Sequence, residues 1–229
     1  MKVDRAMVFA AGFGTRMAPL TDTLPKPLIH VAGRPLIDHA LQLLHGVSVI
    51  VVNTHYRAAQ METHLAGRNV ICLREEPEVL ETGGGLKNAL PLLGDGPVLT
   101  LNSDVIFAGK NPVDALQKAW NPDRMDALLT LIPVKNMVEY YGVGDFFAGG
   151  DGHITRRGSR AAAPFVYGSM QIIKTDVLAE ISENAFSLNV IWDQMIAQKR
   201  AFGLPYDGAW VDVGRPEGIA VAEQVLADV

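Results

Sequence analysis

The chain has 229 residues, of which 48% are hydrophobic and 20% are charged, so its composition is that of a soluble globular protein rather than of a disordered chain. Its formal net charge of −5 disfavours non-specific binding to nucleic acid, which depends on broad cationic surfaces. The single cysteine excludes a disulfide framework, and the sequence has neither a signal-peptide pattern nor an apolar run of about 18 residues, so we expect a cytoplasmic protein that does not cross a membrane.

Strand-like and helix-like segments alternate along the first half of the chain. Short apolar runs predict strands, and apolar residues at helical spacing predict helices. The predicted strands are residues 3–10, 47–52, 70–73 and 98–101, and the predicted helices are residues 36–44, 58–65 and 86–93. Strands that alternate with helices favour right-handed βαβ units and a parallel sheet.

The second half of the chain is less regular. The predicted strands are residues 126–134, 165–174 and 211–213, and the predicted helices are residues 187–200 and 216–226. Residues 142–163, with several glycines and few apolar pairs, predict hairpins or a flexible flap. Because no repeat, low-complexity tract or linker interrupts the chain, we expect a single domain over residues 1–229.

A glycine-rich loop with the sequence A-A-G-F-G-T-R-M follows the first predicted strand, where α/β sheets usually bind ligands. Its small residues let backbone N–H groups approach phosphate oxygens, and Arg16 adds a permanent cation. The loop lacks the Gly-Lys-Ser/Thr ending of a P-loop, and Met17 stands where a dinucleotide fingerprint has its third glycine. The glycines alone fit a tight turn as well as a phosphate site.

Lys26 lies between Pro25 and Pro27, which restrict the backbone on both sides. A lysine held in this way shortly after a phosphate-type loop is better placed to bind an anion than a freely solvated one. The alternative is a proline-rich surface turn with a solubilising lysine. We favour an anion-binding role.

The loop A-A-G-F-G-T-R-M, the run P-K-P-L and the run G-R-P-L-I-D-H together resemble the opening of the sugar-1-phosphate nucleotidylyltransferase family. The resemblance extends over nearly the whole chain, and its pattern is most similar to that of bacterial N-acetylmuramate 1-phosphate uridylyltransferases. It implies a Rossmann-like, GT-A-like α/β fold, with a mixed, mostly parallel sheet and helices on both faces. It also implies a nucleotide half over about residues 1–105 and a sugar half over about residues 106–229.

The resemblance implies a nucleotide site built from the glycine-rich loop, Lys26 and the loop before the third predicted helix. Its expected members are Ala11, Gly12, Gly14, Thr15, Arg16, Lys26, Pro77, Glu81, Gly83 and Asn102. The run L-E-T-G-G-G departs from the family's usual form, because Glu81 replaces a glycine, and this variant is typical of the muramate branch. Its three glycines would let a base rest against the backbone. The alternative is a helix N-terminus that Thr82 caps.

The resemblance also implies a sugar site, with Asn102, Asp145, Tyr167 and Gly168 as its expected members. An ionised carboxylate such as that of Asp145 suits hydroxyl and amide donors on a sugar ring. Asp145 fits a simple turn residue nearly as well. Many relatives carry Glu-Lys-Pro upstream of the last long strand, and this motif is missing. One of Arg156, Arg157 and Arg160 can supply the charge instead, and the sequence does not choose among them.

Two aspartates are candidate Mg²⁺ ligands. Asp104 directly follows a predicted strand, and Asp212 lies in the run W-V-D-V-G, which matches the family's W-x-D-V-G. Magnesium usually takes one or two protein carboxylates and completes its octahedron with phosphate oxygens and water. The two residues are 108 positions apart, and each alone fits a loop or cap residue. The resemblance implies that they hold the metal together.

These features predict an enzyme that joins a sugar 1-phosphate to a nucleoside triphosphate and releases pyrophosphate. The expected substrates are UTP and N-acetylmuramate 1-phosphate, and Arg16 and Lys26 are the expected catalytic residues. Mannose or heptose 1-phosphate with GTP, and phosphocholine with CTP, are alternative substrates. A non-catalytic NDP-sugar sensor is the alternative of another class. We expect a monomer or a small homo-oligomer.

Overall fold

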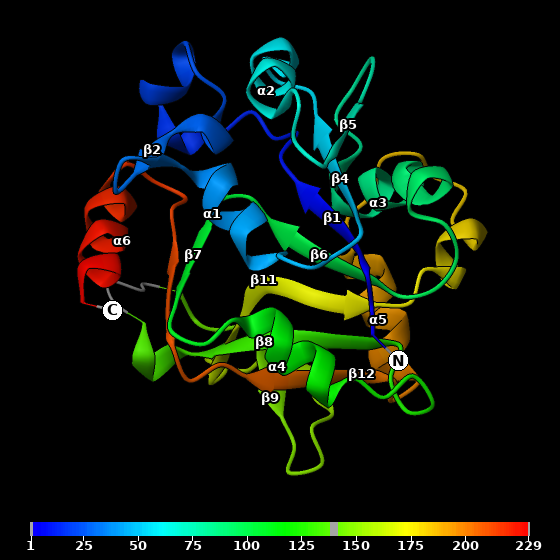
Figure 1. Ribbon diagram of the computed structural model, residues 1–229. Coiled ribbons are helices and arrows are strands. Elements are labelled where there is room, and N and C mark those ends of the chain that lie inside the picture. Colours follow the sequence, from blue (N-terminus) through cyan, green and yellow to red (C-terminus); the bar gives the residue numbers. More distant parts are fainter. Residues whose placement is uncertain (1, 138–141, 229) are drawn as a thin grey trace.

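The computed structural model describes residues 2–137 and 142–228 and shows a large central sheet with helices packed around it (Figure 1). The strands are β1 (Arg5–Phe9), β2 (His30–Val31), β3 (Arg34–Pro35), β4 (Val49–Thr54), β5 (Ile71–Arg74), β6 (Val98–Asn102), β7 (Val105–Ala108), β8 (Ala127–Pro133), β9 (Phe146–Ala148), β10 (Ile154–Arg156), β11 (Phe165–Ile173), β12 (Ala201–Pro205) and β13 (Ala209–Asp212). The α-helices are α1 (Leu36–Leu43), α2 (Ala58–Leu65), α3 (Glu81–Leu93), α4 (Pro112–Ala119), α5 (Asn189–Ala197) and α6 (Glu217–Ala227). Short 3₁₀ turns are η1 (Thr15–Met17), η2 (Leu20–Asp22), η3 (Lys26–Leu28), η4 (Val134–Asn136) and η5 (Asp176–Glu180). Two further pairs, β13 with β7 and β2 with β3, form small separate sheets.

The first half of the chain forms the parallel part of the sheet, in the order β5-β4-β1-β6. β1 lies between β4 and β6, and its central residues are buried because helices cover both faces of the sheet. The register places Phe9 beside both Asn53 and Asn102. The carboxyl ends of these three strands therefore meet at one edge of the sheet.

The second half of the chain extends this sheet through β11, which pairs with β6 in the antiparallel direction. β8 pairs with β11 on its other side, and β12 then pairs with β8 in the parallel direction. The pairing of β11 with β8 shifts register between Tyr167 and Gln171, and Ser169 within this irregularity has a φ of 63°. β9 and β10 form the hairpin that the sequence predicts, and β9 touches the start of β11. The expected mixed α/β sheet is confirmed.

Helices cover both faces of the sheet, as the sequence predicts. On one face, apolar residues of α1, α2 and α4, among them Ile37, Met61 and Leu116, pack in one buried cluster with β1 and β6. Helices α3 and α5 cover the other face (Figure 1). There, Leu86 of α3 and Ile191 of α5 pack in a second cluster. In the described part of the chain, no helix combines the length and the apolar character that crossing a bilayer demands.

Helix α3 begins at Glu81, whereas the sequence predicts a helix only after the three glycines, from residue 86. Glycine has a low helix propensity, so the sequence pattern does not predict the first turn of α3. Close packing explains the glycines, because a Cβ at Gly83 would lie 2.4 Å from the Phe186 ring and a Cβ at Gly84 would lie 2.0 Å from the Asn184 carbonyl oxygen. The glycines therefore let the first turn of α3 lie against residues 184–186.

The sequence analysis also missed β7, α4 and β12. The strand β12 contains Gly203, which weakens the strand signal, yet a Cβ there would lie 2.2 Å from Leu131 on the neighbouring strand. The helix α4 is a two-turn element whose first turn starts with Pro112 after the capping residue Asn111. Short elements of this kind give little periodic signal.

Candidate active site

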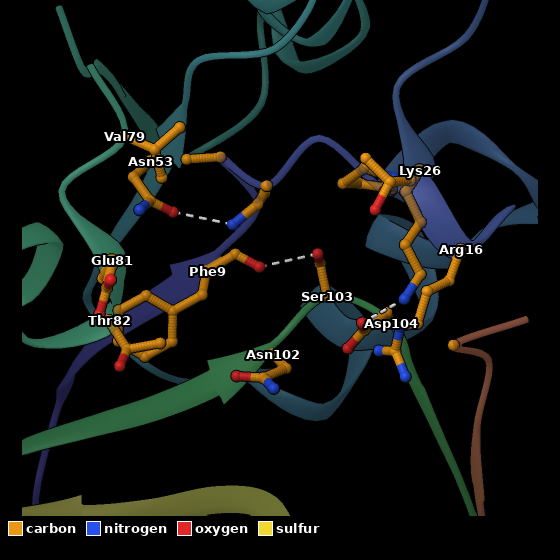
Figure 2. Close-up of a pocket in the computed structure, with 17 residues that line it drawn as sticks. Phe9, Arg16, Lys26, Asn53, Val79, Glu81, Thr82, Asn102, Ser103 and Asp104 are labelled. Carbon is orange, nitrogen blue, oxygen red and sulfur yellow. Dashed lines mark hydrogen bonds and ion pairs between the residues drawn. The ribbon is translucent and has the colours of Figure 1, made fainter. Parts of the chain in front are cut away.

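A cavity of about 310 Å³ lies at the carboxyl ends of β1, β4 and β6 (Figure 2). Its walls come from the glycine-rich loop after β1, from η3, from the start of α3 and from the segment after β6. Of the predicted nucleotide-binding residues, those that line it are Ala11, Gly12, Gly14, Thr15, Arg16, Lys26, Glu81 and Asn102. The fold therefore brings together residues that are spread over about 90 positions of the chain.

The glycine-rich loop owes its shape to Gly14. This residue has a φ of +64° and precedes η1, and a Cβ there would lie 2.9 Å from the Cβ of Lys26. Its carbonyl oxygen accepts a hydrogen bond from the Thr21 hydroxyl at 3.1 Å. At Gly12, in contrast, no atom lies within 4 Å of an added Cβ, so the backbone there faces open space. The loop is thus fixed at one glycine and open at the other.

Lys26 and Arg16 point to Asp104 from the same side of the cavity (Figure 2). Lys26 is only 8% exposed, and its Nζ donates a hydrogen bond to Oδ2 of Asp104. Pro25 and Pro27 hold the backbone of η3, so the ammonium group is directed into the cavity as the sequence analysis expects of an anion-binding lysine. The anion that it contacts in this structure is the Asp104 carboxylate.

Asp212 reaches the same cluster through the pairing of β13 with β7. Asp212 lies opposite Val105 in this antiparallel pair, and the backbone N–H of Val213 donates to the Asp104 carbonyl oxygen at 2.9 Å. Gly214 adjoins both Asp212 and Arg16, since a Cβ there would lie 3.0 Å from Asp212 Oδ1 and 3.2 Å from Arg16 Nη2. Two carboxylates and two cations therefore converge although they come from four separate segments.

The electrostatics of this cluster favour a bound cation. Desolvation and the neighbouring Asp104 raise the pKa of Asp212, while Lys26 and Arg16 oppose the shift. The raised pKa means that burial and the second carboxylate together disfavour the ionised form of Asp212 more than the two side-chain cations favour it. Among the described residues, no group of three or more His, Cys, Asp or Glu side chains forms a metal cluster. A pair of carboxylates that leaves coordination positions to phosphate and water fits Mg²⁺.

The wall opposite the charged cluster contains a buried polar network that the sequence analysis missed. Asn53 Oδ1 accepts from the Ala10 N–H at 2.8 Å, and its Nδ2 donates to Glu75 Oε1 at 2.7 Å. Glu75 is 1% exposed, and its Oε2 accepts from the Leu80 N–H at 2.9 Å. This network connects the glycine-rich loop to the segment before α3. In the sequence, Glu75 looks like a surface residue because Arg74 and Glu76 flank it.

The start of α3 presents Glu81 and Thr82 to the cavity, and the segment before it presents Val79 (Figure 2). Glu81 has a φ of +58°, a backbone conformation that favours glycine, so the residue is held under strain at the cavity wall. The N–H groups of Gly83 and Gly84 point away and donate to the Phe186 carbonyl oxygen at 2.8 and 3.1 Å.

Pro77 and Gly83 lie apart from this cavity. Pro77 lines a neighbouring hollow with His55 and Arg74, and Gly83 packs against Phe186. Thr82 does not cap its own helix, because its hydroxyl oxygen accepts from the Leu188 N–H at 3.0 Å. The roles in nucleotide binding that the sequence implies for Pro77 and Gly83 stay predictions.

A second cavity of about 310 Å³ adjoins the first and shares Phe9, Thr82 and Asn102 with it. Asp145 and Tyr167, two of the predicted sugar-binding residues, line this second cavity. Oδ2 of Asp145 accepts from the Tyr167 N–H at 2.9 Å. Asn102 lines both cavities, and the double role expected of it in nucleotide and sugar binding stays a prediction.

The remaining walls of the second cavity come from residues that the sequence analysis assigned no role, at Phe146, Ser187, Leu188, Asn189 and Trp192, and from Arg156. The Trp192 ring packs edge-on against Tyr167, with the ring centroids 4.7 Å apart, and also lines the cavity. Gly168, a predicted sugar-binding residue, is not part of this lining. Its carbonyl oxygen accepts from Trp210 Nε1 at 3.1 Å.

Comparisons with known proteins agree with this geometry. Residues 5–156 match the Nucleotidyl transferase family. The chain is 41% identical to the N-acetylmuramate alpha-1-phosphate uridylyltransferase of Caulobacter vibrioides over 97% of both chains. It is 34% identical to the protein of the same name from Neisseria meningitidis, over 92% of this chain and 93% of that protein. The fold is similar to that of the inositol-1-phosphate CTP transferase from T. maritima, with a TM-score of 0.79 at 16% identity over 99% of this chain and 96% of that one.

Proposed function

The chain belongs to the nucleotidyl transferase family and is a sugar 1-phosphate nucleotidyltransferase, and we propose that it joins UTP to N-acetylmuramate 1-phosphate. The products are UDP-N-acetylmuramate and pyrophosphate. The observation that carries the choice of substrates is the 41% identity to a uridylyltransferase for this sugar, which extends over 97% of both chains. The two adjoining cavities support the proposal, because a nucleotide and a sugar need separate pockets that meet where the phosphates react.

We assign the nucleotide to the first cavity and the sugar to the second. Their shared wall at Phe9, Thr82 and Asn102 lies between the base side and the sugar side. In this arrangement residues 1–105 supply most of the nucleotide site and residues 106–229 supply most of the sugar site. Asp212 and Gly214 return from the second half to the phosphates.

In the reaction, an oxygen of the sugar phosphate attacks the α-phosphorus of UTP, and the bond from this phosphorus to the pyrophosphate oxygen breaks. The attacking oxygen is already ionised, so no general base is needed, and catalysis depends on alignment and charge neutralisation. Arg16 neutralises the triphosphate and the leaving pyrophosphate. Lys26 draws the attacking phosphate to the α-phosphate, and its buried, proline-flanked position fixes the direction of approach.

Asp104 and Asp212 would hold the metal, and a bound Mg²⁺ supplies further charge neutralisation to the phosphate oxygens. The Lys26 ammonium, which lies on Asp104, is then close to both the metal ligands and the phosphates. We also propose that the enzyme acts in the cytoplasm, since a chain with one cysteine gains nothing from an oxidising compartment.

Pyrophosphate release from each of four nucleoside triphosphates, measured against a panel of sugar 1-phosphates, tests the proposal. The panel contains the 1-phosphates of N-acetylmuramate, N-acetylglucosamine and mannose, together with phosphocholine. We expect the highest kcat/KM for UTP with N-acetylmuramate 1-phosphate. A preference for GTP with mannose 1-phosphate, or for CTP with phosphocholine, would replace the proposed substrates. Binding of UDP-sugars without turnover of any pair would instead identify a sensor.

A further inference from the structure

N-acetylmuramate differs from N-acetylglucosamine by a lactyl ether on O3, which carries a carboxylate. An enzyme that distinguishes the two sugars needs a group that favours this negative charge beside the sugar ring. Of the described residues that line the second cavity, Arg156 is the sole cation and Asp145 the sole anion. The charge pattern of this wall therefore suits a ligand with polar donors on one side and an anion on the other.

The structure separates Arg156 from the other two arginines of its hairpin. Arg157 Nη1 donates to the carbonyl oxygens of Gly158 and Arg160, at 3.1 and 2.8 Å. Arg160 donates to the carbonyl oxygens of Arg157 and Arg156, and its guanidinium lies 3.9 Å from the centroid of the Phe147 ring. Both side chains thus fold back on their own loop. Arg156 instead lines the sugar cavity.

The Arg156 guanidinium is held in place by aromatic rings and hydrogen bonds. It lies 5.0 Å from the centroid of the Phe146 ring and 5.5 Å from that of Trp192. Its Nε donates to Asp193 Oδ1 at 2.8 Å, and its Nη2 donates to the Asn189 carbonyl oxygen at 3.3 Å. No described residue accepts a hydrogen bond from Nη1. A cation that is already oriented and keeps two N–H groups for a ligand loses little entropy when it binds a carboxylate.

The support for this cation is itself buried. Trp192 is 6% exposed, and its Nε1 donates to Gln171 Oε1 at 2.8 Å. Gln171 in turn donates to the Thr100 hydroxyl at 3.1 Å. Asp193, in contrast, is an exposed partner, with 63% of its side chain accessible, so it competes only weakly with a ligand carboxylate.

We propose that Arg156 binds the lactyl carboxylate of N-acetylmuramate 1-phosphate and gives the sugar cavity its preference for this substrate. The proposal rests on the proposed function and deepens it. Asp145 then faces the hydroxyl and amide groups of the sugar, while Arg156 reads the one group that N-acetylglucosamine lacks.

The test compares both sugar 1-phosphates on the same variants, with UTP held at saturation. In Arg156→Met, which keeps an unbranched apolar stem against the rings, kcat/KM for N-acetylmuramate 1-phosphate should fall by about 10- to 100-fold, mainly through KM. The value for N-acetylglucosamine 1-phosphate should change by less than about 3-fold, because that sugar has no carboxylate for Arg156 to bind. Arg160→Met removes one positive charge from the same hairpin and should leave the ratio of the two values unchanged.

An equal loss for the two sugars in Arg156→Met would show that Arg156 only supports the fold, and would overturn the proposal. A failure of the proposed function is visible earlier, since the wild-type enzyme would then show no preference for N-acetylmuramate 1-phosphate. If Arg156→Met does not fold, Arg156→Lys and the ionic strength provide the test. Lys should keep part of the preference, and the wild-type preference should shrink as salt rises, whereas a preference independent of both would refute the role of the charge.

Discussion

The two carboxylates of the charged cluster should have equal effects on catalysis and opposite effects on stability. Asp104→Asn and Asp212→Asn each remove one of the two proposed metal ligands with almost no change of shape. Turnover should fall on the order of 10²-fold or more in both, since a metal ion contributes several kcal/mol of transition-state stabilisation. The two residues differ, however, in what they contact when no substrate is bound.

Asp104 is the partner of a buried cation. The side chains of Lys26 and Asp104 are 10% and 24% exposed. Breaking a buried ion pair costs about 3 to 5 kcal/mol, and we expect about 2 to 3 kcal/mol here because the amide oxygen of Asn still accepts a hydrogen bond. For a domain of this size each kcal/mol corresponds to about 2 to 4 °C, so Tm should fall by roughly 4 to 12 °C.

The substitution of Asp212 should have the opposite effect on stability. Its pKa is raised in the folded protein by desolvation and by Asp104, so its ionised form destabilises the fold. This unfavourable contribution is fully present above the raised pKa and disappears below the pKa of the unfolded chain. Asp212→Asn should therefore melt at or above the wild-type temperature at neutral pH, and the difference should shrink as the pH falls.

Differential scanning calorimetry with EDTA, beside steady-state rates with Mg²⁺, measures both properties. Asp104→Asn at the wild-type Tm would show that Lys26 does not depend on this carboxylate. An equal loss of Tm in Asp212→Asn would refute the repulsion between the two acids. Near-normal rates at limiting Mg²⁺ in either variant would contradict the metal assignment.

Substitutions at three further positions test other parts of the site. Lys26→Ala should lower kcat more than it weakens UTP binding in a direct titration. Lys26→Arg should restore kcat only in part, because a planar guanidinium replaces a compact ammonium. Lost UTP binding at an unchanged kcat would contradict the role we give Lys26. Glu81→Gly should stabilise the protein by about 0.5 to 1 kcal/mol in chemical denaturation, because it relieves the backbone strain of a φ of +58°. A loss of stability would show that the Glu81 side chain stabilises the fold by more than the strain costs. Glu75→Gln should destabilise the protein by about 1 to 3 kcal/mol and raise KM for UTP, because the NH₂ group of Gln cannot accept a hydrogen bond and would face either the Asn53 or the Leu80 donor. An unchanged Tm and KM would show that the buried network does not contribute to the site.

Three of the charged residues that line the first cavity, Arg16, Lys26 and Asp104, are candidates from the sequence alone, and the reason is local. Arg16 and Asp104 lie in short motifs that follow β1 and β6, two neighbouring parallel strands whose carboxyl ends meet at one edge of the sheet. Lys26 lies in the proline-flanked run shortly after the glycine-rich loop. Asp212 was different. Only the resemblance connected it to Asp104, because the pairing of β7 with β13 that joins them involves two short strands, and β7 was not predicted.

The second cavity was harder to predict from the sequence. Its walls at Asn189 and Trp192 belong to a helix, and the helical pattern alone says that such residues pack without saying that they also border a cavity. Glu75 shows the same limit, since its burial depends on the fold around a charged run of the sequence. Arg156 could be selected from three arginines only once the contacts of Arg157 and Arg160 were visible.

The attachment of α3 to residues 186–188 has a consequence for how the two substrates bind. Thr82, Gly83 and Gly84 hold this segment by hydrogen bonds to Phe186 and Leu188, while Val79 and Glu81 border the nucleotide cavity. Leu188 borders the sugar cavity. A nucleotide that shifts the first turn of α3 must therefore also shift a wall of the other pocket. By thermodynamic reciprocity, the factor by which UTP changes the affinity for the sugar phosphate equals the factor by which the sugar phosphate changes the affinity for UTP. We therefore expect the two substrates not to bind independently, and the affinity of each should change by the same factor when the other is bound.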